Sequence, residues 1–517
     1  MPLDHNVNEV YKKALKAADI SKDNIKSMCI NKKSVDARGN NIKFIYSVSL
    51  NLENTAKIKF SDKVKEEKTF KYEIKRGEAL LESRPVIIGF GPAGLFCAYL
   101  LAKYGYKPLV FEQGKSIDDR KKDVETFFNE RIFNNRSNIQ FGEGGAGTFS
   151  DGKLTTRIND ERCRFVLETL CKFGADEKIL YEAHPHIGTD KLTEIIKNMR
   201  NEITNLGGNI YFERKMTDLI IKDGAVKGVV LEDNEKVYSD SVILAIGHSS
   251  RDTYYMLDKK EIFMEKKAFS VGFRVEHSRE MIDRGRYGKY AGHKNLGAAE
   301  YQLSFREGNR GCYTFCMCPG GKVIASNSEE NSVVTNGMSE SKRDMINSNS
   351  AVVASVLPED FDSSVFSGIE FQRKLEQMAF ELGGRDYSAP CQLTKDYLNN
   401  IKSTNFMNVK PSYPLGTQFC NFNDVFPVKV NEMLLKGLAN FDKKIKGFSS
   451  DNGVLTGIET RTSAPLRITR KENYNSVSIK GLYPAGEGAG YAGGITSAAV
   501  DGLRIAQYII ENYKEQW

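Results

Sequence analysis

Apolar and polar residues follow different periods along the chain, and the changes divide it into parts. Near the start, helical spacing of apolar residues predicts an amphipathic helix over residues 7–18. Residues 25–30 and 42–50 are rich in β-branched and aromatic side chains and predict strands, with turn residues at 39–41. Together these elements predict a small α/β domain over residues 1–82.

A second pattern begins after residue 84. Residues 85–89 form a continuous apolar run, which is typical of a strand buried in a parallel sheet. Residues 95–104 predict a helix that is apolar nearly all round, and residues 108–112 predict a second strand ending in an acidic residue. This order of strand, turn, helix and strand is typical of a dinucleotide-binding unit.

The same order returns later in the chain. Residues 190–206 predict a helix with Thr189 as its N-cap, and residues 209–213 predict the strand that follows it. From residue 481 a buried strand and a glycine loop lead into an amphipathic helix over residues 501–512.

The predicted fold class is therefore α/β, because buried strands alternate with helices. We predict a Rossmann-like cofactor-binding domain over residues 83–268 and 441–517, interrupted by an α+β substrate domain over residues 269–440. The pattern of the interrupting segment is irregular and predicts many short elements.

The turn after the first strand carries the sequence G-x-G-x-x-G. Gly89 permits a tight turn, Gly91 lets a phosphate approach the backbone, and Gly94 allows the helix to pack closely on the strand. The helix that opens here presents unpaired N–H groups and a positive dipole end to a pyrophosphate. Glu112 ends the second strand, where its carboxylate can accept hydrogen bonds from ribose hydroxyls.

Residues 142–147 repeat the glycine spacing but lack its context. No buried strand precedes them and no apolar helix follows them. We therefore predict a glycine loop that lies against a ligand, and only one dinucleotide-binding domain.

Two further segments favour FAD over NAD as the tightly held cofactor. Residues 240–247 are an apolar strand that ends in Ala245 and Gly247, and this strand resembles the second fingerprint of glutathione-reductase-like FAD proteins. Residues 482–488 resemble the third, in which an acid, here Glu487, binds the ribityl chain of FAD. The glycine loop after it opens a helix whose N-terminus can stabilise the negative charge of reduced flavin.

With these motifs in hand, the chain resembles the bacterial family known as FAD-dependent protein C, or FAD-utilizing dehydrogenases. The resemblance covers nearly the whole chain. It rests on residues 33–38, 141–154, 184–190, 315–321, 457–463 and 486–494. It implies a glutathione-reductase-type FAD domain with an inserted substrate domain and a small domain ahead of it, and it implies no particular substrate.

The predicted cofactor site draws on all of these segments. Its expected residues are Gly89, Gly91, Pro92, Ala93, Gly94, Glu112, Gln113, Gly145, Ala146, Gly147, Thr148, Lys153, Met216, Ala245, Gly247, Gly486, Glu487, Gly493, Gly494 and Ile495.

Few side chains are needed for catalysis, because flavin itself performs the hydride or electron transfer. Cys316 and Cys318 lie in a segment that ends in Pro-Gly-Gly, where a thiolate could relay electrons or bind substrate covalently. The alternative is that both cysteines are structural and unreactive. His186 is a candidate proton donor, and the alternative is an ordinary loop residue. Arg461 is a candidate cation for an acidic substrate or reduced flavin, and the alternative is an ordinary surface ion pair.

Metal chemistry is not expected. Cys316, Cys318, His184 and His186 could supply soft ligands, but their spacing is not that of an ordinary zinc site. The spacing of the nine cysteines is not that of a disulfide framework. The sequence also shows no signal sequence and no apolar run long enough to span a membrane. These features favour a cytoplasmic, non-membrane protein.

These features predict an FAD-dependent oxidoreductase that acts on a small organic substrate or a redox carrier and exchanges electrons with a transient partner such as NAD(P)H. The net charge of +7 gathers in residues 1–84, which hold eighteen Lys and Arg against twelve Asp and Glu. That excess leaves open an RNA-modifying flavoprotein, although no basic stripe interleaved with aromatic residues supports a nucleic-acid partner. A flavin electron-transfer protein without its own small substrate is a further alternative. The sequence leaves the oligomeric state undetermined.

Overall fold

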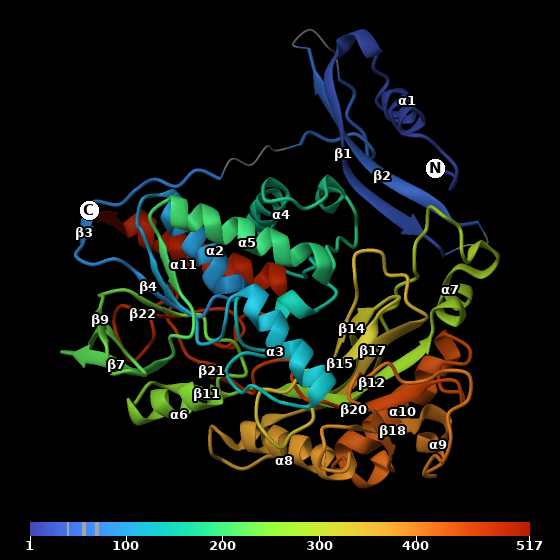
Figure 1. The fold of residues 1–517 in the computed structure, drawn as a ribbon. Coiled ribbons are helices and arrows are strands. Elements are labelled where there is room, and N and C mark those ends of the chain that lie inside the picture. The colour runs from blue at the N-terminus through green and yellow to red at the C-terminus, as the bar shows by residue number, and fades with distance from the viewer. Residues whose placement is uncertain (39–40, 54–57, 68–71) are drawn as a thin grey trace.

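The computed structural model describes residues 1–38, 41–53, 58–67 and 72–517 (Figure 1). Its N-terminal unit consists of α1 (Val7–Ala18) and an antiparallel hairpin of β1 (Ile25–Asp36) and β2 (Lys43–Leu52). The predicted helix is confirmed, and both strands run further than predicted. The predicted turn at 39–41 includes residues 39 and 40, which lie outside the described part of the chain.

The hairpin stands off from the body in Figure 1 and touches it at two places. Leu3 and Phe44 form a small apolar cluster with Tyr287 and Tyr290. Farther along the hairpin, the backbone of Lys33 exchanges hydrogen bonds with the 181–183 segment. The N-terminal unit is therefore anchored to the body at both regions.

A five-stranded sheet forms the centre of the cofactor-binding unit, and its strands are all parallel. In spatial order the strands are β22 (Leu482–Pro484), β10 (Val242–Leu244), β4 (Val86–Ile88), β5 (Leu109–Phe111) and β6 (Asn209–Tyr211). The three central strands and β22 are buried almost completely, which explains their continuous apolar sequences.

The two faces of this sheet are covered differently. Alternate residues such as Ile87 and Ile243 pack against helices on one face. Their neighbours, such as Val86 and Val242, pack on the other face against a three-stranded antiparallel sheet and α6. The helical layer contains α2 (Pro92–Lys103), α4 (Arg162–Lys172), α5 (Thr189–Asn205) and α11 (Ile495–Asn512). The second layer contains β7 (Met216–Lys222), β8 (Ala225–Leu231), β9 (Lys236–Tyr238) and α6 (Arg251–Lys259).

The body also contains a seven-stranded mixed sheet with its own hydrophobic core (Figure 1). Its order is β13 (Ser304–Glu307), β14 (Arg310–Cys318), β17 (Asn347–Val356), β12 (Phe269–Ser278), β20 (Val454–Glu459), β18 (Ala389–Leu393) and β19 (Thr417–Phe419). Helices α8 (Ser367–Leu382) and α10 (Val428–Lys444) pack on this sheet. β20 lies after residue 440, the predicted end of the inserted domain, yet it pairs within this seven-stranded sheet. The exact domain boundaries therefore stay a prediction.

Smaller elements connect the two large sheets and the termini. They are α3 (Ile117–Glu130), α7 (Arg279–Tyr287), α9 (Thr394–Leu398), and the strand pairs β11 (Met264–Lys266) with β21 (Leu466–Ile468), β15 (Lys322–Ala325) with β16 (Thr335–Met338), and β3 (Ala79–Leu81) with β23 (Tyr513–Glu515). Within the described residues, none of the helices has both the length and the apolar character that a membrane crossing requires.

The predicted helices at 95–104 and 501–512 begin earlier in the structure, at Pro92 and Ile495, and the N-cap of α5 also differs from the prediction. Thr189 is the first residue of α5, and Gly188 occupies the N-cap with a φ of 85°. The Thr189 hydroxyl donates instead to the carbonyl of Thr148 at 2.6 Å. Its side chain therefore ties the helix to the neighbouring glycine loop, and does not cap the helix.

Candidate cofactor cavity and active site

A large open cavity lies where the parallel strands of the cofactor-binding unit end. Residues at or just after the carboxyl ends of β4, β5, β10 and β22 line it, which is the usual ligand position in open parallel sheets. The cavity encloses about 1570 Å³ of empty space, in which the open solvent at its mouth is included.

The first glycine turn forms one wall of this cavity. Gly89 has a φ of 97°, and a Cβ on Gly94 would overlap the carbonyl oxygen of Gly89. Gly91 is the N-cap of α2 and lines the cavity, where a Cβ would meet nothing closer than Gly145 Cα at 3.7 Å. The N-terminus of α2 is therefore open to an anionic group, as the sequence predicts.

Glu112 follows β5 and holds three loop segments together. Its Oε2 accepts from the Phe90 N–H at 2.9 Å, and its Oε1 accepts from the N–H groups of Gly114 at 2.9 Å and Gly142 at 3.0 Å. A carboxylate offers about four acceptor positions, so these three bonds leave one for a ribose hydroxyl. Glu112 lines the cavity and is only 5% exposed.

The second glycine loop lies directly beside the first, and a buried arginine holds it. Arg120 on α3 donates to the backbone carbonyls of Asn138, Ile139 and Glu143, with distances of 2.7–2.9 Å. A Cβ on Gly145 would lie 3.0 Å from Gly91 Cα, so the two glycine turns face each other closely. The prediction that residues 142–147 form a loop beside a ligand site agrees with this placement, because the loop lines the cavity.

The C-terminal glycine loop closes a third side. Gly494 is the N-cap of α11, has a φ of 81° and lines the cavity, where a Cβ would meet nothing within 4 Å. Gly247, after β10, also has a positive φ of 71° and equally open surroundings. Both glycines expose backbone to the empty space, so a ligand can approach the main chain there.

Most of the predicted cofactor residues meet at this cavity. Those that line it are Gly89, Gly91, Pro92, Ala93, Glu112, Gln113, Gly145, Ala146, Gly147, Lys153, Met216, Ala245, Gly247, Glu487, Gly494 and Ile495. Those that do not line it are Gly94, Thr148, Gly486 and Gly493. Two of these pack behind the lining: Thr148 donates to the Glu143 carbonyl, and the Gly486 N–H donates to Asp501.

Two acidic side chains of the cavity are suited to proton transfer. Burial raises the pKa of Glu487 to about 7, although Lys267 opposes the shift. Burial likewise raises the pKa of Glu459 to about 7, against the opposing charge of Arg274. A group that titrates near neutral pH can both accept and release a proton there.

His248 lies beside Glu487 and follows Gly247. Its Nδ1 is 3.6 Å from Glu487 Oε1, and its Nε2 is buried without a hydrogen-bond partner. Burial lowers the pKa of His248 to about 3, so the ring is neutral. Neither His248 nor Glu459 is among the residues predicted from the sequence, and the Ala-Ile-Gly-His order after β10 was the available signal for the histidine.

The four predicted catalytic residues do not gather in one place. Cys316 and Arg461 line the cavity, whereas Cys318 and His186 lie outside the lining set. His186 is placed by a backbone bridge to Lys153 and a 3.3 Å contact with the Ser341 carbonyl. The structure therefore separates His186 from the cavity surface.

Arg461 is already paired within the protein. Its Nε and Nη2 bind the buried Glu376 at 2.8 and 3.1 Å, and its Nη1 donates to Ser249 at 2.9 Å. Arg251 binds the same carboxylate from the other side. This arrangement favours a positioning role for Arg461 over that of a free cation for substrate.

Further lining residues lie outside the predicted set of site residues. They are Ile88, Phe111, Gln140, Phe141, Gly142, Ser150, Asp151, Arg214, Lys215, Ile246, Ser249, Ser250, Thr253, Phe315, Asn336, Thr462, Ala485 and Ala498. They come from both large sheets and from loops far apart in the chain. Among the described residues, no group of three or more His, Cys, Asp or Glu is placed to hold a metal ion.

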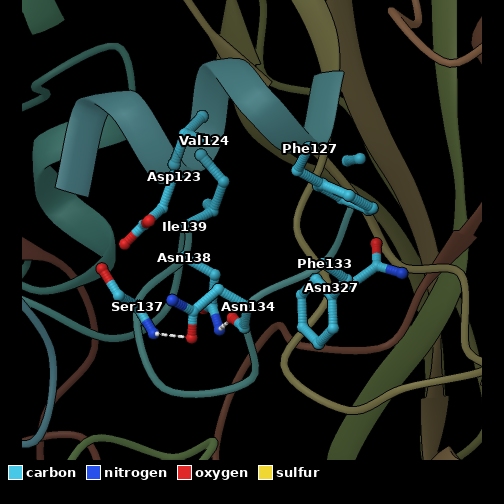
Figure 2. Close-up of a pocket in the computed structure, with 10 residues that line it drawn as sticks. Asp123, Val124, Phe127, Phe133, Asn134, Ser137, Asn138, Ile139 and Asn327 are labelled. Atoms are coloured by element: carbon cyan, nitrogen blue, oxygen red, sulfur yellow. Dashed lines mark hydrogen bonds between the residues drawn. The ribbon is translucent and has the colours of Figure 1, made fainter. Parts of the chain in front are cut away.

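A second, much smaller pocket lies under α3 (Figure 2). Asp123, Val124 and Phe127 face it from α3, opposite Asn138 and Ile139 of the segment that Arg120 holds. It encloses about 210 Å³ including open space. Its size makes it a packing gap behind the cavity wall.

Comparison with known proteins identifies the family. The description "FAD-dependent protein, C-terminal domain-like" matches residues 268–462, "NAD(P)-binding Rossmann-like domain" matches residues 87–117, and a domain of unknown function matches residues 1–51. An uncharacterised protein from Clostridium beijerinckii is 47% identical over 99% of this chain and 98% of its own length. The chain belongs to the family of FAD-dependent proteins.

Solved structures similar to this FAD-dependent protein are more distant. Glycine oxidase from Bacillus cereus is 13% identical with a TM-score of 0.36, over 84% of this chain and 98% of its own. Glycerol-3-phosphate dehydrogenase from Bacillus halodurans, complexed with FAD, is 12% identical with a TM-score of 0.35, over 84% and 65%. With TM-scores this low, neither structure contributes to the assignment of function.

The cavity of this FAD-dependent protein fits its cofactor. Glu112 keeps an acceptor position free, and the helix N-termini of α2 and α11 both open on the cavity. Gly247 and Gly494 have no side chain, so the space beside their backbone, which a Cβ at either position would partly fill, stays open to a ligand. FAD is thus the cofactor that both the family and the shape of the site indicate.

Proposed function

We propose that the protein is an FAD-dependent oxidoreductase that acts on a small organic substrate. The observation that carries this proposal is that one cavity joins the three cofactor-facing loops to Cys316, Glu459 and His248. These three side chains come from different parts of the chain, and together they supply a thiol, an acid and a neutral imidazole beside the cofactor cavity.

Bound FAD supplies electron transfer through its N5 position. The protein would contribute binding and orientation: Glu112 would accept a hydrogen bond from the ribose, and the N-termini of α2 and α11 would stabilise the negative charges of the pyrophosphate and of reduced flavin. Glu459 carries an unpartnered Oε2 and a pKa of about 7, so it can hold or accept the substrate proton. Transient NAD(P)H is the proposed source or acceptor of electrons.

The test begins with the purified protein. We expect one yellow flavin per chain, and anaerobic mixing with NADH or NADPH should bleach its absorbance at a rate that saturates with the nucleotide. Candidate small substrates are then screened for reoxidation of the flavin in the same cell. Protein that folds but binds no FAD would end the proposal, and reduction only by an acidic carrier protein would replace it with electron transfer.

A matched pair of variants tests the role of Glu459. We expect Glu459→Gln to keep its FAD and to lose about a hundredfold to ten-thousandfold in turnover of the substrate found, the usual range for a general acid–base group. Glu381→Gln, on the exposed end of α8, is the control and should behave as the parent. Equal turnover by both variants would remove Glu459 from the proposal.

A further inference from the structure

Cys316 and Cys318 occupy the end of β14, where the strand departs from regular pairing. The register between β14 and β17 shifts between Phe315 and Cys318, and Cys316 has a φ of 43°. Few residues other than glycine adopt this left-handed conformation. The irregularity puts Cys316 on the cavity lining, while Cys318 is fully buried behind it.

The two cysteines contact each other and a buried cation. The Cys318 thiol donates to the Cys316 carbonyl at 3.4 Å, and a side-chain hydrogen bond joins the two sulfur groups. Arg274 Nη2 donates to the Cys316 carbonyl at 2.8 Å and lies 3.6 Å from Cys318 Sγ. The pair is therefore held together under a positive charge that favours one thiolate.

Space for this cation is secured by a glycine. A Cβ on Gly337 would overlap the Arg274 guanidinium, so glycine at this position of β16 leaves the space in which Arg274 reaches the Cys318 sulfur. The ammonium of Lys153 donates to the carbonyl of Met317, between the two cysteines. Two cations thus converge on the three-residue segment.

The two thiols differ in acidity in a way that suits a nucleophile and its resolving partner. The hydrogen bond from Cys318 lowers the pKa of Cys316 to about 6, whereas the same bond and burial raise that of Cys318. Burial raises the pKa of six other cysteines: Cys97, Cys163, Cys171, Cys312, Cys391 and Cys420. Accessible thiolates beside a second thiol are typical of redox-active cysteines.

We propose that Cys316 and Cys318 form a reversible disulfide that exchanges two electrons with the bound FAD. In the oxidising direction an S–S bond forms, the S–H bond of Cys318 breaks, and FAD takes up that proton and both electrons. In the reverse direction reduced FAD returns them and the thiolate and thiol are restored. The cysteine pair would then store two further electrons beside the cofactor. This inference rests on the proposed FAD-dependent function.

Anaerobic reductive titration of the FAD-loaded protein tests the couple. The protein is first oxidised with ferricyanide, which is removed, and is then titrated with dithionite while flavin absorbance is followed. We expect the parent to consume twice as much reductant per flavin as Cys316→Ser or Cys318→Ser. Cys29→Ser, whose thiol is exposed on the N-terminal hairpin, is the matched control and should consume as much as the parent.

A second measurement needs no variant. Oxidised and reduced parent protein are unfolded in iodoacetamide, digested and analysed by mass spectrometry. We expect the peptide that contains residues 316–318 to be protected in the oxidised sample and doubly alkylated in the reduced one. Double alkylation in both samples, or equal reductant consumption by parent and serine variants, would overturn the inference while leaving the FAD function standing; absence of bound FAD would instead overturn the proposed function.

Discussion

At the scale of single residues, Glu112 joins three loops at the proposed cofactor site. It accepts three backbone N–H groups from three different loops and keeps one acceptor position for the ligand. Because hydrogen bonds to a charged group are stronger than neutral ones, the loss of its charge should loosen all three loops together.

We expect Glu112→Gln to weaken FAD binding by about tenfold to a hundredfold, since hydrogen bonds to charged groups contribute about 1.5–3 kcal/mol each. Equilibrium binding of FAD to deflavinated protein, followed by flavin fluorescence, measures the change. Glu125→Gln, exposed on α3, is the control and should bind FAD as the parent does. An unchanged dissociation constant for the Glu112 variant would contradict its assigned role.

The acidity of Cys316 gives a second prediction at this scale. Its thiolate should react with iodoacetamide at a rate that rises with pH through a midpoint of about 6, because the hydrogen bond from Cys318 and the charge of Arg274 favour ionisation. The groups that face it are Cys318, Arg274, Lys153, Asp151, Glu459 and Glu487. Lys153→Met removes one positive charge and should move the midpoint upwards, whereas a midpoint that stays fixed would exclude Lys153 as a contributor.

The residues of the proposed cofactor site were easier to predict from the sequence than those of the proposed catalytic site, for a physical reason. A glycine turn between a buried strand and a helix is a local pattern, so Gly89, Gly91 and Glu112 could be predicted. His248 and Glu459 reach the cavity only through the packing of segments that lie far apart in the chain. No local sequence pattern predicts a contact between such distant segments. The ion pair of Arg461 with Glu376 could not be predicted for the same reason.

At the scale of elements, the contact between α2 and α11 sets the position of both helix N-termini. A Cβ on Gly502 of α11 would overlap the Ala93 carbonyl at the start of α2. The helices therefore pack backbone against backbone where they approach the cavity.

We expect Gly502→Ala to destabilise the protein and to lower its FAD content. Alanine gains about 1 kcal/mol in helix propensity, but overpacking typically costs about 1–3 kcal/mol, and overlap with a backbone atom cannot be relieved by a rotamer change. Urea denaturation and the flavin absorbance per chain give the two readouts. Gly285→Ala in α7 is the control, because its Cβ would meet only the Ile445 side chain, at 3.1 Å; equal loss in both variants would contradict the packing argument.

The sequence pattern predicted those helices and strands that are buried on both faces or strongly amphipathic. The apolar run before Gly89 and the helical spacing of residues 7–18 were sufficient to predict β4 and α1. The seven-stranded sheet was not predictable, because β20 pairs with β12 from nearly two hundred residues earlier in the chain. Its long helices α8 and α10 were missed as well.

At the scale of the whole molecule, a buried histidine makes stability depend on pH. Burial lowers the pKa of His277 to about 4, although its bond to the Phe448 carbonyl opposes the shift. An unfolded histidine titrates near 6.5, so between these values the unfolded chain binds more protons. The free energy of unfolding should therefore fall as the pH falls from about 6.5 to 4, by up to about 3 kcal/mol from this residue.

Urea denaturation at several pH values between 4 and 7 tests this dependence. We expect His277→Gln to be less stable than the parent at pH 7 and to lose less on acidification, because it has no proton to gain. His184→Gln is the control, since the His184 side chain is 73% exposed. A slope that is the same in parent and His277 variant would assign the pH effect to other groups.

The order of β22, β10 and β4 in one sheet also has a consequence for biosynthesis. β22 and α11 come from residues 482–512, yet β22 borders β10, and α11 brings its N-terminus to the cavity. A nascent chain that has not yet exposed these residues has the Gly89 turn but lacks the wall formed by Gly494. Domains fold as units during synthesis, so we expect flavin to bind only after residues 482–512 have left the ribosome.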